Sequence, residues 1–259
     1  MLEYIKFGEA PYKLLLIHGF PSNYTVWDNI IPELSKTTSG IAVNMPGVGS
    51  SPTVPKLSLD IIADKIIEVI DAEQMEAIHL VGHSMGGYTA LNLVQKCNKI
   101  AGLTLLHSGA NADSEERARN RIKSIALMEK GEFEKGVFIT AMFKNFFEKQ
   151  FTTTHPDIIK KYIDIGKKMP LEVVVGLFSA ILERQDSFDF IRNTAMPIQY
   201  ILGTEDTATP LNEILPQAAM PQKCMVNIYQ HCGHGAFEER PEELTRDLLA
   251  FHQYLYSGN

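Results

Sequence analysis

The sequence predicts an α/β protein in which a mostly parallel central sheet is flanked by helices and interrupted by an all-helical insertion. Short apolar runs alternate with longer segments of helical periodicity, which is typical of parallel sheets. The alternation stops between residues 110 and 190 and then resumes. A length of 259 residues suits one large domain, or one domain with an insertion. We therefore predict a core of residues 1–109 and 191–259 and an insertion of residues 110–190.

Composition and charge exclude several other classes of protein. Hydrophobic residues make up 45% of the chain and charged residues 21%, so the chain is neither largely disordered nor fibrous. The net charge of −7 argues against a nucleic-acid partner, which needs a basic face. Three cysteines are too few for a disulfide scaffold, and no apolar run approaches the roughly 18 residues of a membrane span. We expect a cytoplasmic protein without a membrane partner.

The N-terminal elements follow from apolar runs and turn residues. Residues 2–7 and 13–17 are expected to form a hairpin, because Gly8-Glu9-Ala10-Pro11 between them is a turn sequence. Apolar side chains share one face of a helix over residues 25–34. A strand is expected over residues 40–44.

The next elements lead to a sharp turn. Ser58 suits the N-cap of a helix that extends to residue 72, with isoleucine and valine at helical spacing behind it. A strand over residues 77–81 turns through residues 82–86 into a helix over residues 88–95. A further strand covers residues 100–106.

The insertion and the C-terminal part complete the pattern. Helices are expected in the insertion at residues 117–130, 133–147, 156–168 and 171–183. Alternation then resumes with strands at residues 198–202 and 225–229 and helices at residues 211–219 and 241–256. Pro241 suits the first position of the last helix, and two glutamates follow it at the positive end of the helix dipole.

The strongest chemical signal is the sequence Gly82-His83-Ser84-Met85-Gly86. It follows an apolar strand and opens a helix, which is the context of a nucleophile elbow. The two glycines allow close approach of neighbouring backbone, and the turn exposes the hydroxyl of Ser84 near a helix N-terminus. We predict that Ser84 is a nucleophile.

A serine hydroxyl is a weak nucleophile and needs a base. Of eight histidines we favour His234, because it follows the last expected strand, where an α/β sheet gathers its site. Asp206, after the strand at residues 198–202, is the expected carboxylate that orients the base. Its neighbour Glu205 could be confused with it, and Asp113 is a second choice. Triads occur in several chain orders, of which Ser84, Asp206, His234 is one.

The tetrahedral intermediate of ester cleavage needs hydrogen-bond donors for its oxyanion. The elbow supplies the backbone N–H of Met85. The second donor is expected from His18-Gly19-Phe20-Pro21, which follows the strand at residues 13–17, with the N–H of Phe20 as the best candidate.

These motifs together resemble the α/β-hydrolase fold family over essentially the whole chain. The resemblance rests on His18-Gly19-Phe20-Pro21, Pro46-Gly47-Val48-Gly49-Ser50, Gly82-His83-Ser84-Met85-Gly86-Gly87, Gly203-Thr204-Glu205-Asp206 and Gly233-His234. It implies a central sheet with helices on both sides and makes the insertion a helical cap over the active site. Haloalkane dehalogenases and epoxide hydrolases of this fold carry Asp at the elbow, so Ser84 argues against both.

We therefore expect a serine hydrolase that cleaves small, largely apolar carboxylic esters through an acyl-enzyme, without a cofactor. Apolar insertion residues that face the triad would line the pocket. Activity would fall as the pH drops through the pKa of the base, about 6.5 for an unperturbed histidine. Two alternatives remain open: a capped ligand receptor or signalling regulator with slow turnover, and a carbon–carbon bond hydrolase. The latter is disfavoured because His83 stands where such enzymes often have Asn. The oligomeric state is also open.

No metal is expected at the site. His18, His83 and His107 each end or follow an expected strand and could converge on an ion. The first two belong to the hydrolase motifs, and the chain contains no Cys-x-x-Cys spacing.

Overall fold

The computed structural model describes residues 1–257, and its centre is a seven-stranded sheet of order β1-β3-β2-β4-β5-β6-β7. All neighbouring strands pair in parallel except β1, which is antiparallel to β3. The predicted mostly parallel sheet is thus confirmed. The strands are β1 (Tyr4–Phe7), β2 (Leu14–Ile17), β3 (Gly40–Val43), β4 (Ile78–His83), β5 (Ile100–Leu106), β6 (Ile198–Gly203) and β7 (Cys224–Tyr229).

The expected hairpin of residues 2–7 and 13–17 is wrong. β1 pairs with β3, from Tyr4 opposite Val43 to Phe7 opposite Gly40, and β2 lies between β3 and β4. Every residue of β2 is buried, whereas β1 is only partly buried. A strand that is apolar on both faces belongs inside a parallel sheet, and a half-buried strand suits its edge. The turn sequence Gly8-Glu9-Ala10-Pro11 therefore predicts a bend but not the strand with which β1 pairs.

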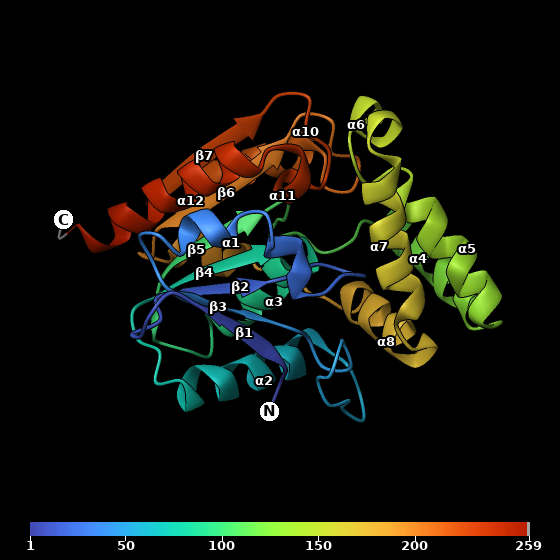
Figure 1. Cartoon of the computed structure of the whole chain (residues 1–259), viewed down its shortest axis with the longest axis horizontal. Coiled ribbons are helices and arrows are strands. Elements are labelled where there is room, and N and C mark those ends of the chain that lie inside the picture. The colour runs from blue at the N-terminus through green and yellow to red at the C-terminus, as the bar shows by residue number, and fades with distance from the viewer. Residues whose placement is uncertain (258–259) are drawn as a thin grey trace.

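Helices cover both faces of the sheet. Figure 1 shows α12 (Pro241–Tyr256) and α1 (Ile31–Leu34) on one face and α2 (Leu59–Ala72) and α3 (Met85–Leu93) on the other. The Ser58 side chain caps α2 by accepting from the N–H of Ile61, as its position predicted. The smaller elements are η1 (Tyr24–Trp27), α10 (Leu211–Ile214), η2 (Leu215–Ala219) and α11 (Ala236–Glu239).

Two expected helices are each divided into two pieces. The helix predicted over residues 25–34 is η1 followed by α1, and Pro32 lies in the first turn of α1. The helix predicted over residues 211–219 is α10 followed by η2, and Pro216 lies in the first turn of η2. Because proline lacks an N–H, it begins a helix more readily than it continues one.

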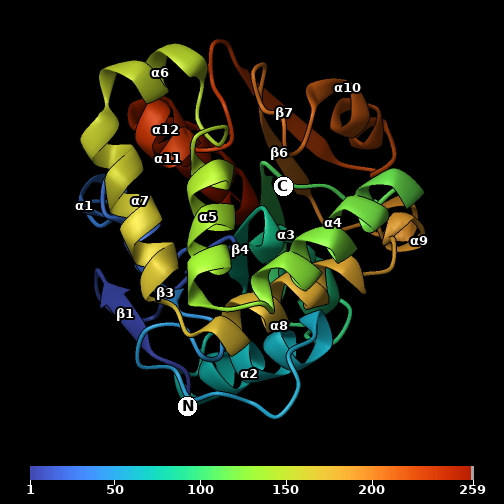
Figure 2. The same cartoon turned by 90° about the vertical axis from the view of Figure 1, so that its right-hand side faces the viewer.

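Residues 110–190, here called the helical insertion, lie beyond one end of the sheet. Figure 1 shows α4 to α8 at the right of the sheet, and in Figure 2 they face the viewer. The N–H of Ser187 donates to the carbonyl of Ala110 over 2.7 Å, so the chain enters and leaves the insertion at one place. Its helices are α4 (Glu115–Met128), α5 (Glu132–Phe143), α6 (Lys149–Thr154), α7 (Pro156–Lys168) and α8 (Leu171–Leu182). The next helix, α9 (Phe188–Asn193), begins in the insertion and ends beyond residue 190.

Within the insertion, α5 packs against α7 and α4 packs against α8. The sequence predicted these four helices but missed α6 and α9, which have six residues each and are too short to show a helical period. No helix in residues 1–257 is both long and apolar enough to cross a bilayer.

Candidate active site

Ser84 lies between β4 and α3 in a strained backbone conformation. Its φ of 50° and ψ of −116° are outside the regions that residues with a side chain favour. The N–H of Ser84 donates to the carbonyl of Leu106 over 2.9 Å, and its carbonyl accepts from the hydroxyl of Ser108 over 2.9 Å. These bonds to the end of β5 and to the residues after it hold the turn, which has the geometry that the motif predicted.

The elbow needs glycine at residue 86 because the backbone of Ile17 and His18 passes too close to leave room for a side chain. A Cβ added there would lie 2.6 Å from the carbonyl oxygen of His18 and closer still to that of Ile17.

We expect Gly86→Ala to lower the free energy of unfolding by about 2 kcal/mol or more, since the carbonyl groups of Ile17 and His18 must move. Urea unfolding checks this. Gly136→Ala is the control, because its Cβ would meet only the flexible end of Lys167 at 3.4 Å. Equal effects of the two variants would contradict the close approach.

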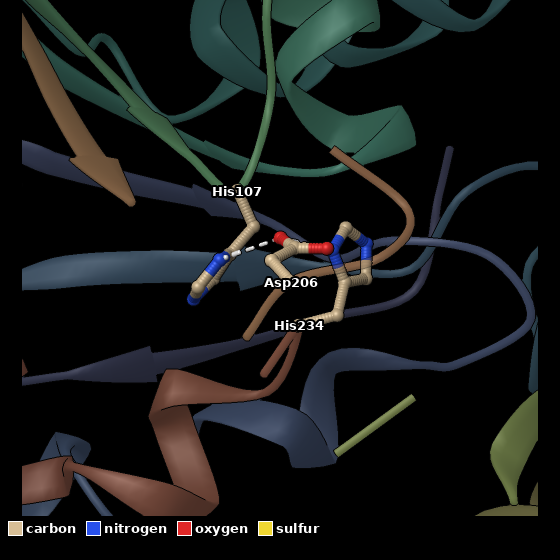
Figure 3. A group of neighbouring side chains, drawn as sticks. All are labelled: His107, Asp206 and His234. Atoms are coloured by element: carbon tan, nitrogen blue, oxygen red, sulfur yellow. Dashed lines mark hydrogen bonds and ion pairs between the residues drawn. The ribbon is translucent and has the colours of Figure 1, made fainter. Parts of the chain in front are cut away.

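The carboxylate of Asp206 lies between two histidine rings. Its Oδ2 accepts from Nδ1 of His234 over 2.8 Å and from Nδ1 of His107 over 2.9 Å (Figure 3). All three residues are buried, with exposed fractions of 5% for Asp206, 3% for His234 and 0% for His107. Because an ionised carboxylate only accepts, both rings carry a proton on Nδ1, which leaves Nε2 of His234 free to act as a base.

Further hydrogen bonds hold the Asp206 carboxylate. The N–H groups of Ala208 and Thr209 donate to Oδ1, each over 2.9 Å, and the hydroxyl of Thr209 donates to Oδ2 over 2.6 Å. Burial raises the pKa of Asp206, but the charge of His234 and the hydrogen bonds from both histidines outweigh burial and hold the pKa well below its usual range. The carboxylate therefore stays ionised and can stabilise a protonated His234.

The trio that sequence reasoning considered for a metal does not assemble as a ligand set. His18 bonds to the Gly19 carbonyl and to the N–H of Met45, and in residues 1–257 it does not form a possible ligand group with His83 and His107. Within residues 1–257 the group that could hold an ion is instead His107, Asp206 and His234, whose ligand atoms lie within 4.8 Å of one another. An ion there would have to displace the two Nδ1 hydrogen bonds to Asp206.

The loop that carries His234 is fixed from both sides. The N–H of His234 donates to the Phe146 carbonyl over 2.7 Å, and the carbonyl of His234 accepts from Nε2 of His83 over 2.9 Å. The buried carboxylate of Glu239 accepts from the N–H groups of Gly233 and Gly235. Phe146 belongs to the helical insertion, so the insertion holds the His234 backbone in place directly.

Sequence reasoning missed His107 as a partner of Asp206 and Glu239 as a support of the His234 loop. His107 follows β5, next to β6, and this adjacency is the signal that could have placed it near Asp206. Glu239 lies in the four-residue α11, which no periodicity reveals.

The two expected oxyanion donors are the backbone N–H groups of Met85 and Phe20. Met85 is the first residue of α3, so its N–H has no partner within the helix. In the part of the chain that the structure describes, the N–H of Phe20 makes no hydrogen bond. The Phe20 ring packs on Phe178 of the helical insertion with 5.1 Å between ring centroids.

His18 supports the Phe20 loop as a neutral ring. Its Nδ1 proton is donated to the Gly19 carbonyl over 2.8 Å, and its Nε2 accepts from the Met45 N–H over 3.1 Å. Burial lowers the pKa of His18 to about 4, and burial likewise lowers the pKa of His252 to about 4. Both rings therefore take up protons more readily in the unfolded chain.

We expect acid to destabilise the fold between about pH 6.5 and pH 4. In this window the unfolded chain binds more protons than the native protein, so stability rises with pH and is lost on acidification. For fully buried His18 the effect at pH 4 is on the order of 3 kcal/mol, at about 1.4 kcal/mol per pKa unit. Urea unfolding at a series of pH values measures the slope, and His252→Gln should flatten it. A stability that stays constant from pH 7 to pH 4.5 would contradict this assignment.

Ser84 and His234 line one partly open cavity of about 320 Å³ beneath the helical insertion. Within residues 1–257 no hydrogen bond joins the Ser84 hydroxyl to His234, as is common in unliganded hydrolases, where such bonds tighten on binding. Aromatic and aliphatic side chains dominate the lining. The cavity is lined by Phe20, Ser84, Tyr88, Arg121, Phe138, Ala141, Met142, Phe146, Phe178, Ile181, Ala208, Thr209 and His234.

The two alternative carboxylates are placed elsewhere. Asp113 bonds to Arg121 and Arg184, with neither Ser84 nor His234 among its partners. Glu205 is exposed, and its backbone N–H donates to the Cys232 carbonyl. Asp206 is the carboxylate that reaches the His234 ring.

Known proteins share this sequence pattern and fold. Residues 12–241 match the model of the alpha/beta hydrolase fold family. The chain is 28% identical over 256 residues to a pimeloyl-(acyl-carrier protein) methyl ester esterase of Neisseria meningitidis, covering 93% of this chain and 78% of that protein. It is 26% identical to a 2-hydroxymuconate semialdehyde hydrolase of a Pseudomonas species, covering 93% and 88%. A malate-bound thermophilic esterase from Thermogutta terrifontis superimposes with a TM-score of 0.91 at 25% identity, covering 98% and 94%.

Proposed function

Because this chain belongs to the alpha/beta hydrolase fold family, we propose that it is a serine esterase with Ser84, His234 and Asp206 as its catalytic triad. The family and the esterases among the relatives identify an ester-hydrolysing enzyme. The serine mechanism, the roles of individual residues and the substrate are our proposal. We also assign the helical insertion, residues 110–190, as the cap of the site, because its residues supply much of the cavity lining.

The first half-reaction acylates the enzyme. Nε2 of His234 takes the Ser84 proton while Oγ attacks the ester carbonyl carbon, and the carbonyl π electrons move to oxygen. The N–H groups of Phe20 and Met85 bind this oxyanion, and each such donor contributes about 3 kcal/mol to transition-state stabilisation. The carbonyl re-forms as the bond to the alkoxy oxygen breaks, and His234 gives its proton to the leaving alcohol.

The second half-reaction regenerates Ser84. A water molecule gives one proton to Nε2 of His234 and attacks the acyl carbon. The oxyanion occupies the same two N–H groups, and collapse returns the Ser84 oxygen, which regains its proton from His234. In both halves the ionised Asp206 holds the ring through Nδ1 and stabilises its positive charge.

The hydrogen bond of His234 to a carboxylate with a depressed pKa, in a cavity that also exposes Ser84, is the observation that carries this proposal. The cavity volume of about 320 Å³ and its aromatic lining favour a small, largely apolar ester. One relative is named for a methyl ester, which agrees with a small leaving alcohol.

Hydrolysis of p-nitrophenyl esters from acetate to octanoate tests the proposal. We expect many turnovers per chain, with an optimum at short to medium acyl length because the cavity is small. A single burst without turnover would instead indicate a ligand receptor with a slow deacylation step. Failure of a folded protein to cleave any ester in the series, and also simple methyl esters, would reject the proposal.

A further inference from the structure

The cavity beneath the helical insertion carries one permanent charge on its wall. Arg121, on α4, lines it together with Ser84 and His234. Among the lining residues of the described chain, Arg121 is the one whose side chain is charged at every physiological pH. Placing a guanidinium in a small apolar cavity costs free energy unless the group is paired with an anion. The hydrogen-bond partners of Arg121 therefore determine whether it can bind a ligand.

Arg121 is held along one edge and one face. Its Nε donates to Oδ2 of Asp113 over 2.7 Å, and its Nη2 lies 3.3 Å from Oδ1. Its Cζ lies 4.6 Å from the centroid of the Phe178 ring. This side-on pairing leaves Nη1 without a hydrogen-bond partner in residues 1–257. The guanidinium is therefore rigidly placed with one donor edge unused.

Asp113 does not need Arg121 for charge balance. Arg184 also donates to its Oδ1 over 2.8 Å, and the Arg184 side chain is 3% exposed. The other nitrogens of Arg184 are occupied, since Nε donates to the Asn111 carbonyl and Nη1 to the Ile181 carbonyl. Two guanidinium groups thus share one carboxylate, and the cluster keeps a net charge of +1 that one further anion would neutralise.

We propose that Nη1 of Arg121 binds a carboxylate of the substrate, so that the preferred substrates are monoesters of dicarboxylic acids. This inference rests on the proposed esterase function and names its substrate class. A single guanidinium edge fits the planar, singly charged carboxylate. We place the carboxylate on the acyl chain, because the acyl chain stays on the enzyme through both half-reactions. Its contact with Arg121 can then assist both acylation and deacylation. The apolar walls would accommodate the methylene groups between the two ends.

Matched pairs of esters test this proposal. The monomethyl esters of glutaric, adipic, pimelic and suberic acid are compared with the corresponding methyl ester amides, which have the same length but no charge. We expect the wild type to favour the acid over the amide by about tenfold or more in kcat/KM at the best length, mostly through KM, as for a charge-assisted hydrogen bond. In Arg121→Gln this ratio should fall towards one.

Arg119→Gln is the matched control, because Arg119 is on the same helix and is exposed, and within residues 1–257 its side chain pairs with Glu115 alone. It removes the same charge and should keep the wild-type ratio. A wild-type ratio near one, or an equal loss in Arg119→Gln, would overturn the proposal. So would an unchanged ratio in Arg121→Gln. If the enzyme hydrolyses the methyl ester group of acids and amides equally well, Arg121 is rejected as an anchor, but the esterase function still holds.

Inhibition of the wild type gives a readout that does not depend on any variant folding. With a neutral p-nitrophenyl ester as substrate, we expect free dicarboxylates of the best length to inhibit competitively and their diamides to inhibit about tenfold or more weakly. Equal inhibition by dicarboxylates and diamides would overturn the proposal.

Discussion

Ser84→Ala is expected to lower kcat for ester hydrolysis by about 10⁴- to 10⁶-fold, with the fold retained. The variant removes the attacking oxygen and leaves the cavity, His234 and the two N–H donors in place. Steady-state kinetics with the best p-nitrophenyl ester measure the loss, and circular dichroism checks the fold. The melting temperature should not fall, because alanine tolerates the strained elbow no worse than serine does.

Ser108→Ala is the control for this experiment. Ser108 is buried beside the elbow and donates to the Ser84 carbonyl, so its loss weakens a backbone contact without removing the nucleophile. We expect its effect on kcat to stay within about tenfold, the cost of one ordinary hydrogen bond. A Ser84→Ala variant that keeps more than about 1% of the wild-type kcat would contradict the serine mechanism.

Asp206→Asn is expected to lower kcat by about 10⁴-fold. The N–H groups of Ala208 and Thr209 both donate to Oδ1, so the amide oxygen must take that position and the NH₂ group must replace Oδ2. That NH₂ group then faces Nδ1 of His234 and of His107 as a donor. His234 must carry its proton on Nε2 instead, and it cannot accept the Ser84 proton.

Glu205→Gln is the control, because Glu205 is the adjacent carboxylate and is exposed. It should change kcat by less than about threefold, as expected for a surface substitution. pH–rate profiles of both variants complete the comparison. Asp206→Asn activity equal to that of Glu205→Gln would show that Asp206 does not orient the base.

The sequence predicts those parts of this protein that depend on local pattern. β5, α7 and α12 have the expected bounds because apolar period, proline and capping residues are local signals. The grouping of Ser84, Asp206 and His234 could be proposed from the sequence because each follows a strand of a parallel sheet, and such strand ends meet at one edge. The elbow conformation of Ser84 also follows from its own sequence motif.

Other features depend on contacts between distant segments and could not be predicted in this way. The pairing of β1 with β3 in place of β2 depends on which strand is buried on both faces, and the turn sequence does not reveal it. His107 shares Asp206, and Arg121 shares Asp113 with Arg184, only because separate segments pack together. The spacing of residues along the chain does not predict which side chains share a carboxylate.

Mass spectrometry of the acyl-enzyme tests the central claim most directly. The wild type is mixed with the best p-nitrophenyl ester and quenched in acid during turnover, and the protein is digested and sequenced by fragmentation. We predict an added acyl group on the peptide that contains Ser84, located on Ser84 itself and absent from Ser84→Ala. Rapid turnover with no acylated peptide, or with the acyl group on another residue, would contradict the assignment of Ser84 as the nucleophile.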